Sequence, residues 1–374
     1  MQKFLFYTFF FSIAIQFIYY IIVICVWSKL FITKKTKSTN FTAPQVSIVI
    51  CGKNESKNIV AYLPKVLSQD YPVFEVIFVN DYSTDNSLDE LIIIQNKFPN
   101  LKIINIDKNN EIAFKKGKKY ALTLGIECAK YEWILLTDAD CYPNSNNWIS
   151  SMVNPLKNNK VKIVLGYSPY NLYNSFLSKF ISFETAYTAI SYMTFCKLGY
   201  TYMGVGRNLL YQKKLFFEKN GFSQIQKNVA GDDDLLIQKI ATSSNVDVVF
   251  NSKSWIISKP KRTIKDYINQ KIRHVSVSNE YNIKSKFLLG IIGISQIWSN
   301  FSIILLMILK ISTMFVWYIY ICRLLFILLV YGIFFNRFHN FKIFLSLPLL
   351  DILYSIMNVI ISPSIFFRNL FEWK

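Results

Sequence analysis

The residues best suited to chemistry are two aspartates that end an apolar run, Trp133 to Asp140 (WILLTDAD). Such a run is typical of a strand buried in a parallel sheet. Ligands of open α/β sheets bind beyond the carboxyl ends of these strands, where Asp138 and Asp140 lie. If the backbone stays extended there, both carboxylates point to one side. Because Mg²⁺ commonly combines one or two carboxylates with phosphates, the pair indicates a site for a cation that carries a diphosphate. A solvated turn is the alternative.

The elements that would position these aspartates alternate between strand and helix. Strands are predicted over 46–50, 74–79 and 101–106, and a fourth from Trp133 that ends in Asp138 and Asp140. Helices are predicted after Ser56 as N-cap, after Asp85 or Ser87, and over 117–129. This alternation predicts an α/β fold with a parallel sheet and right-handed crossovers. No GxGxxG or GxxxxGK[ST] motif lies at the turns, so neither a dinucleotide fingerprint nor a P-loop is indicated.

Further polar residues follow the same strand ends. Asn54 and Glu55 follow the first strand and Asp81 follows the second, so all three are expected at the edge that carries the aspartate pair. Each is also a common turn residue, and their shared location is what favours a site. Lys118 opens the helix before the aspartate strand and would add a cation for phosphate, although a solvated helix face also explains a lone lysine.

Composition and charge place part of the chain in lipid. The 374 residues are 52% hydrophobic, above the roughly 45–50% usual for soluble domains. The formal net charge of +19 indicates an anionic partner, which is a membrane surface, a phosphorylated substrate or nucleic acid. The six cysteines lack CxxC spacing, so neither a zinc site nor a disulfide framework is indicated, and a reducing compartment is expected.

Residues 1–28 are predicted to form a transmembrane anchor. The segment from Phe4 to Trp27 has about 24 residues without a charge, enough for a bilayer of roughly 30 Å. Lysines crowd the basic linker of residues 29–44 and mark the cytoplasmic side: Lys29, Lys34, Lys35 and Lys37. A cleaved signal peptide is the alternative, although its apolar core would normally be shorter.

Residues 287–374 are predicted to return to the membrane, with candidate spans over 287–309, 311–335 and 343–361. The basic loop at 336–342 would be cytoplasmic by the positive-inside rule. Arg323 lies inside the second span, where it should face a partner helix or a lipid headgroup. Pro348 and Asp351 leave a re-entrant last segment open as an alternative.

Residues 259–286 are predicted to form a basic interfacial helix. Basic residues crowd the segment around it, namely Lys253, Lys259, Lys261, Arg262, Lys265, Lys271 and Arg273. A basic amphipathic helix lies on membranes and would gather a lipid phosphate. A nucleic-acid patch is the alternative, but no nucleic-acid motif accompanies it and predicted spans flank it, so no nucleic-acid partner is expected.

Taken in order, several motifs resemble those of family 2 glycosyltransferases: Val46 to Ile50 with Asn54-Glu55, Val79 to Asp85, Gly117-Lys118 with Ala121-Leu122, and Asp138-Ala139-Asp140. The resemblance implies a GT-A fold over residues 45–258, which is a mixed, mainly parallel sheet flanked by helices. It also implies a nucleotide-diphosphate sugar as donor, Mg²⁺ or Mn²⁺ as cofactor, and inversion at the transferred sugar.

The same resemblance implies roles for the residues at the strand ends. Glu55 and Asp81 would contact the nucleobase or ribose, and Asn54 and Lys118 would belong to the nucleotide-sugar site. In the DxD motif, Asp140 would be the direct metal ligand. Asp138 would be the partner of the ribose or of the metal's outer shell.

The second half of the domain resembles the acceptor side of these enzymes. In Gly204-Val205-Gly206-Arg207-Asn208, Arg207 and Asn208 would contact the donor sugar, or Gly206 would simply allow close backbone approach. Three aspartates from Asp232 to Asp234 open a helix, where negative charge is favoured. Inverting transfer also needs a carboxylate that takes the acceptor proton. Counting back from Leu235 selects Asp232 as this catalytic base, and a shift of one selects Asp233.

Residues 270–274 (QKIRH) resemble the family's QxxRW motif with histidine in place of tryptophan. Arg273 would clamp the diphosphate, and Gln270 lies on the same helical face, so both are assigned to the nucleotide-sugar site. The tryptophan stacks on the acceptor sugar in processive synthases. His274, as the expected acceptor contact, therefore favours an enzyme that adds one sugar.

The sequence as a whole predicts a membrane-anchored, inverting glycosyltransferase. The acceptor would be a lipid or a lipid-linked glycan, and the catalytic domain would lie on the cytoplasmic face of the inner (plasma) membrane. The alternatives are a processive polysaccharide synthase and a catalytically silent membrane scaffold of the same fold. The presence of Asp138, Asp140 and Asp232 argues against the scaffold.

Overall fold

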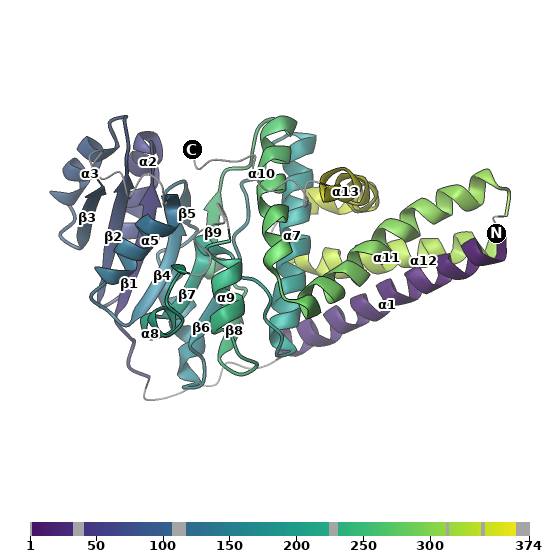
Figure 1. Ribbon diagram of the computed structural model, residues 1–374, viewed down its shortest axis with the longest axis horizontal. Helices are drawn as coiled ribbons and strands as arrows, with labels where there is room; N and C mark the ends of the chain where they lie inside the picture. Colours follow the sequence, from purple (N-terminus) through teal and green to yellow (C-terminus); the bar gives the residue numbers. More distant parts are fainter. Residues whose placement is uncertain are drawn as a thin grey trace. The chain divides into compact units, whose positions relative to one another are not determined.

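The computed structural model describes residues 2–32, 41–106, 117–223, 231–311, 314–337 and 341–363. Within these ranges the chain forms two compact units (Figure 1). The sheet unit takes residues from 36–172 and 195–260, and the helical unit takes residues from 1–35, 173–194 and 261–369. The predicted linker at 29–44 and the end of the predicted 287–374 domain fall partly outside the described residues.

A seven-stranded mixed sheet forms the centre of the sheet unit. Its strands lie in the order β3 (Leu101–Ile106), β2 (Phe74–Asp81), β1 (Val46–Gly52), β4 (Trp133–Asp138), β7 (Leu209–Gln212), β6 (Ile163–Gly166) and β8 (Val246–Val249). The first four strands are parallel, and β7 runs antiparallel to both of its neighbours. The fold class expected from the sequence, a mixed and mainly parallel sheet flanked by helices, is confirmed.

Helices cover the sheet on both faces, which explains why the strands read as continuous apolar runs. Side chains of alternate strand residues such as Ile48 and Ile50 pack in one core with α2 (Ser56–Leu67) and α6 (Trp148–Val153). The intervening residue Val49 faces α5 (Gly117–Glu127), which comes so close that a Cβ on Gly125 would lie 2.5 Å from Val49 Cγ1. Both faces of β1 are therefore buried.

One predicted helix start needs correction. Ser56 is the first residue of α2, and Glu55 takes the N-cap position without a side-chain capping bond. The backbone N–H of Ser56 instead donates to Asp85 Oδ2 at 3.1 Å, from the loop before α3 (Ser87–Gln95). A partner distant in sequence thus satisfies the helix end that a local cap was expected to satisfy.

The helical unit consists of α1 (Gln2–Ile32), most of α7 (Phe176–Lys197), α10 (Ile264–Ser276), α11 (Ile283–Ile308), α12 (Met314–Arg337) and α13 (Leu347–Ile361). Among the described residues, four helical segments are long and apolar enough to cross a membrane: Gln2–Leu30, Ile283–Ile308, Met314–Phe334 and Ile343–Ile361. Helices α1, α11 and α12 lie side by side and share a hydrophobic core (Figure 1). The predicted anchor and the three predicted spans overlap the four apolar segments.

Arg323 meets a partner helix inside this unit, as its cost in a membrane span requires. Its guanidinium is fully buried and lies 2.9 Å from Asp351 Oδ2 on α13. Asn300 on α11 joins the pair, because its Oδ1 accepts from Arg323 Nη1 at 3.2 Å and its Nδ2 donates to Asp351 Oδ2 at 3.0 Å. Gln296 Nε2 donates to the other carboxylate oxygen at 2.6 Å. The ion pair therefore ties together three of the apolar helices.

We expect Arg323→Leu to destabilise the protein more than the double change Arg323→Leu/Asp351→Leu. The single change leaves a buried carboxylate without its counter-charge, which costs about 3–5 kcal/mol, whereas the double change leaves an apolar contact. Thermal unfolding of the full chain in detergent gives the ranking, with Asp351→Leu completing the cycle. A double variant less stable than either single variant would contradict this role for the pair.

Candidate functional site

The ends of three parallel strands bring the predicted polar residues to one edge of the sheet. In the strand register, Cys51 of β1 lies opposite both Val79 of β2 and Asp138 of β4. Asp81 therefore ends β2 close to the level at which β1 gives way to the loop that carries Asn54 and Glu55. The edge predicted from the order of strands and helices is the edge that the structure forms.

Asn54 locks the loop after β1 to the loop after β2. It adopts a left-handed backbone conformation with φ of 57°. Its backbone N–H donates to Ser83 Oγ at 2.9 Å, and its side-chain oxygen accepts from the backbone N–H of Thr84 at 2.7 Å. Asparagine tolerates this conformation better than most residues. The side chain therefore holds together the loops after β1 and β2. These two loops form a rim at the edge of the sheet, and Glu55 lies on it.

Glu55 and Asp81 offer carboxylates at this rim. Glu55 is half-buried, and Asn58 Nδ2 donates to its Oε2 at 2.5 Å. Burial raises the pKa of Glu55 above its usual value. Asp81 is only 3% exposed. These two acids are held by the fold before any ligand binds.

The ammonium group of Lys118 lies close to two carboxylates that come from distant segments of the chain. Lys118 stands in the first turn of α5, where its ammonium lies 2.9 Å from Asp138 Oδ1 and 3.3 Å from Asp232 Oδ2. The three side chains are 18%, 32% and 15% exposed, so water screens these pairs less than it would on an open surface. Burial alone would lower the pKa of Lys118, but the charges of Asp138 and Asp232 outweigh it and raise that pKa.

Asp233 differs from its neighbour Asp232 because the backbone uses both of its carboxylate oxygens. Oδ1 accepts from the N–H of Asp234 at 2.9 Å and caps α9 (Asp234–Ile240). Oδ2 accepts from the N–H of Gly206 at 2.8 Å. Burial and the neighbouring charge of Asp232 raise the pKa of Asp233. The structure thus gives Asp233 a structural part, whereas Asp232 faces Lys118.

Arg207 is held beside the DxD motif by the strand-end segment after β6. Its Nε donates to Ser168 Oγ at 2.6 Å, and its guanidinium lies 4.7 Å from the ring centre of Tyr170. Burial alone would lower the pKa of Arg207, but Tyr170 and the nearby acidic groups, among them Asp138, raise it. A fixed positive charge therefore stands close to the carboxylates.

Asn208 is fully buried, and its amide joins three separate segments. Its Nδ2 donates to the carbonyl oxygens of Tyr167 at 2.7 Å and Ser254 at 2.8 Å, and its Oδ1 accepts from Trp148 Nε1 at 3.0 Å. Contact with a sugar would require these links to open. The predicted role of Asn208 in donor binding has no support in this geometry.

The backbone does not stay extended through the DxD segment, so the condition under which both carboxylates would point to one side is not met. β4 ends at Asp138, Ala139 and Asp140 form a turn, and β5 (Cys141–Pro143) begins directly after it. The turn nevertheless keeps the ligand atoms of Asp138, Asp140 and Cys141 within 4.8 Å of one another. Two carboxylates on a partly exposed turn are a suitable donor set for a divalent cation whose remaining ligands are phosphate oxygens.

Gln270, Arg273 and His274 lie on α10 in the helical unit, so they are not among the residues that the sheet unit brings together. Within the helical unit, α10 is held to α7 by Glu184. Lys271 Nζ lies 2.6 Å from Glu184 Oε1, and the hydroxyl of Tyr267 donates to Oε2 at 2.6 Å. These contacts fix the rotation of α10, and therefore which face presents Gln270 and Arg273.

Sequence reasoning missed two residues that the structure places at this edge, Lys119 and Cys141. Lys119 is 5% exposed, and burial lowers its pKa to about 8 against the opposing effect of Asp232. Cys141 was set aside with the other cysteines because it lacks CxxC spacing. The signal for Cys141 was available in its position directly after the DxD motif. Lys119 is not distinguished from any helical lysine by the sequence.

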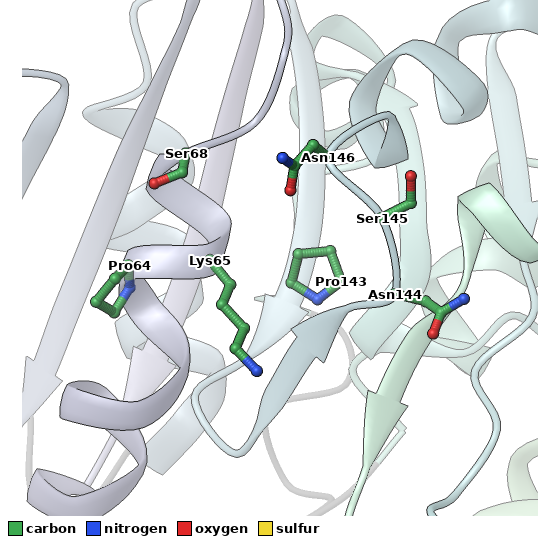
Figure 2. Close-up of a pocket in the computed structure, with 7 residues that line it drawn as sticks. All are labelled: Pro64, Lys65, Ser68, Pro143, Asn144, Ser145 and Asn146. Atoms are coloured by element: carbon green, nitrogen blue, oxygen red, sulfur yellow. The ribbon is translucent and has the colours of Figure 1, made fainter.

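An open cavity of about 370 Å³ lies elsewhere in the sheet unit, between the end of α2 and the segment after β5 (Figure 2). It is lined by Pro64, Lys65, Ser68, Pro143, Asn144, Ser145 and Asn146. None of the predicted site residues lines it, and none of its lining residues carries a carboxylate. The cavity is therefore separate from the acidic edge.

We expect Gly206→Ala to impair the site more than the fold. A Cβ at this position would lie 3.2 Å from both Cβ and Oδ2 of Asp233, so the Asp232–Asp233 segment must shift by a few tenths of an ångström. A small misplacement of reacting groups lowers the rate steeply, and a loss of about ten-fold or more in sugar transfer is expected. Gly290→Ala is the matched control, because nothing lies within 4 Å of its added Cβ. Equal activity of the two variants would contradict the placement.

Comparisons with known proteins agree on the class of this chain. The family model described as glycosyl transferase family 2 matches residues 47–218, and the model described as glycosyl transferase family group 2 matches residues 133–356. A mannosyltransferase from Pyrobaculum calidifontis, solved in complex with GDP-Man and Mn²⁺, aligns with a TM-score of 0.62 at 16% identity. The alignment covers 96% of each chain and shows a shared fold.

Among curated relatives, a poly-β-1,6-N-acetyl-D-glucosamine synthase of Staphylococcus epidermidis is 31% identical over 150 residues, which are 40% of this chain and 35% of that protein. A 4,4'-diaponeurosporenoate glycosyltransferase of Staphylococcus aureus is 26% identical over 164 residues, 44% of this chain and 42% of that protein. The matches thus span well under two thirds of these relatives. The second family model alone covers more than half of the chain, and the chain belongs to the family 2 glycosyltransferases.

Proposed function

We propose that this protein transfers a sugar, with inversion, from a nucleotide-diphosphate sugar to a hydroxyl group of a lipid or lipid-linked glycan at the cytoplasmic face of the plasma membrane. The observation that carries the proposal is the position of Lys118 between Asp138 and Asp232. The carboxylate of Asp138, from the proposed cation-binding motif, and the separate carboxylate of Asp232 thus lie around one ammonium group. Inverting transfer needs both groups, because the donor sugar loses its nucleoside diphosphate and the acceptor hydroxyl group loses its proton.

The donor side of the proposed site consists of the rim and the DxD turn. Glu55 and Asp81 would hold the nucleobase or ribose, with Asn54 fixing the loop between them. Asp140 and Asp138 would hold Mg²⁺ or Mn²⁺, which when bound stabilises negative charge on the departing phosphates. Lys118 would add a permanent positive charge beside the same phosphates.

The acceptor side of the proposed site is the carboxylate of Asp232. An acceptor hydroxyl group placed next to Asp232 would give it a proton while the oxygen attacks the anomeric carbon and the bond to the diphosphate breaks. Asp233 is the weaker candidate, since backbone N–H groups occupy both of its oxygens. Arg207, held by Ser168 and Tyr170, would contact the donor sugar.

The helical unit supports a membrane acceptor. Four segments of the described chain could cross a bilayer, and lysines follow the first of them, which favours a cytoplasmic sheet unit. Gln270 and Arg273 on α10 would clamp the diphosphate, and His274 would contact the acceptor. The Pyrobaculum calidifontis neighbour holds GDP-Man and Mn²⁺, which supports a nucleotide sugar and a divalent cation here as well.

A processive synthase is the second candidate function. It is favoured by the match to a poly-β-1,6-N-acetyl-D-glucosamine synthase over 150 residues. It is opposed by His274, because the aromatic residue expected at that position of a processive enzyme is tryptophan. The length of the product separates the two functions.

The direct test is a donor screen with the purified full chain, membrane lipid, Mn²⁺ and a panel of labelled nucleotide sugars, followed by mass analysis of the lipid fraction. We expect one sugar to be added to a lipid-soluble product. A long polymer would favour the processive alternative. No transfer or hydrolysis from any donor would contradict the proposal.

With the nucleotide sugar and lipid acceptor found by that screen, Asp232→Asn should lower turnover by about 10²–10⁴-fold, since the proposed general base is lost. Asp233→Asn should keep turnover within about ten-fold and lose roughly 1 kcal/mol of stability, because only one of its two backbone hydrogen bonds can persist. Asp247→Asn is the control, since that carboxylate pairs with Lys197 at 2.6 Å and is not part of the proposed site. The reverse ranking of Asp232 and Asp233 would move the base by one residue.

A further inference from the structure

Cys141 brings a third donor atom to the two carboxylates of the DxD turn. The ligand atoms of Asp138, Asp140 and Cys141 all lie within 4.8 Å of one another. The sulfur of Cys141 lies 3.2 Å from Asp140 Oδ1, and the thiol donates to that oxygen. The side chain of Cys141 is only 1% exposed, whereas those of Asp138 and Asp140 are half-buried.

The backbone on both sides of the turn fixes this arrangement. β4 is paired with β1 up to Asp138, and Cys141 begins β5, where it pairs with Ser258 of β9 (Ile256–Ser258). Only Ala139 and Asp140 lie between the two ladders. Strand pairing therefore fixes the backbone that carries the sulfur.

The spacing of the donors suits a shared ion. Metal–sulfur bonds are about 2.3 Å and metal–carboxylate bonds about 2.0–2.2 Å, so a sulfur and an oxygen on one ion lie about 3.1 Å apart at the right angle of a six-coordinate ion and about 3.6 Å apart at a tetrahedral angle. The observed separation between Cys141 Sγ and Asp140 Oδ1 is 3.2 Å. The ligand atom of Asp138 also lies within 4.8 Å of both, although its Oδ1 is paired with Lys118 at 2.9 Å.

The sulfur changes which ion such a site prefers. Carboxylates and phosphate oxygens are hard donors that suit Mg²⁺ and Mn²⁺, whereas a thiolate favours ions such as Zn²⁺ and Co²⁺. A site of two aspartates alone would discriminate weakly among divalent ions. A buried sulfur at the same turn gives the site a soft component that phosphates from the donor cannot supply.

We propose that Cys141 is a ligand of the cation site and shifts its preference from Mg²⁺ towards Co²⁺ and Zn²⁺. The inference rests on the proposed function, which places the cation at Asp138 and Asp140. When the ion enters, the S–H bond breaks, a metal–sulfur bond forms and the proton leaves to solvent. No oxidant or reductant takes part.

A simpler role for the thiol is to orient Asp140 by hydrogen bonding. Serine separates the two roles, because its hydroxyl group keeps a hydrogen-bond donor next to Asp140 but removes the soft ligand. Cys51→Ser is the matched control. Cys51 is a second buried cysteine on the neighbouring strand, and its backbone lies opposite Asp138 in the β1–β4 register, but it is not in the donor cluster.

The test uses Co²⁺ as a spectroscopic probe on the full chain in detergent. Wild-type protein loaded with Co²⁺ should show a sulfur-to-cobalt charge-transfer absorption in the near ultraviolet. Cys141→Ser should lose that band, and Cys51→Ser should keep it. Competition between Co²⁺ and Mg²⁺ should shift towards Mg²⁺ by on the order of ten-fold or more in Cys141→Ser, a loss at least as large as that caused by removing an outer-shell partner.

Two results would overturn the assignment. One is wild-type protein that binds Co²⁺, measured by equilibrium dialysis, without the charge-transfer band. The other is a band that persists in Cys141→Ser. The wild-type spectrum alone can overturn the assignment, so the assignment can be tested even if the serine variant does not fold. Failure of the proposed function would give a different result. The cobalt–sulfur band would be present, but the protein would transfer sugar from no donor.

Discussion

The ion pairs of Lys118 are the interaction on which the proposed site depends. Asp138 reaches it from the end of a central strand, and Asp232 reaches it from the segment before α9. Without the ammonium group, two partly buried carboxylates would repel each other across the space between them. Lys118 therefore allows Asp138 of the proposed cation-binding motif and Asp232, the proposed base, to lie close together.

The remaining structure keeps these partners in place. Parallel pairing of β1 with β2 and β4 sets the level of Asp138 and of the rim loops. Gly206, which has no side chain, allows its own N–H to reach Asp233 Oδ2 at 2.8 Å, and this bond anchors the segment that carries Asp232. The division of labour between adjacent aspartates thus follows from the backbone: one carboxylate is used to hold the loop, and the other is left to face the lysine.

The fold and the location of the site followed from local patterns in the sequence, because apolar runs and strand–helix alternation constrain a parallel sheet strongly. The strand ends at Asp81 and Asp138 could be predicted for this reason. Side-chain partners could not, since they depend on contacts between distant segments. Asn208 looked like a sugar contact but is buried against Trp148 and two backbone carbonyl oxygens. The turn at Ala139 and Asp140 could not be predicted either, because it depends on the pairing of β5 with β9, which comes from a distant segment.

The central claim is that Lys118, through its ion pairs with Asp138 and Asp232, joins two parts of the proposed site with different tasks: the DxD motif, which would bind the donor's cation at Asp140, and Asp232, which would remove the acceptor's proton. The most direct measurement is the Mn²⁺-dependent dissociation constant of the nucleotide sugar for the Asp140→Asn and Asp232→Asn variants of the full chain. The account predicts that Asp140→Asn weakens donor binding by about ten-fold or more, while Asp232→Asn binds the donor nearly as wild type does. Parallel loss of donor affinity in both variants would contradict the division of tasks.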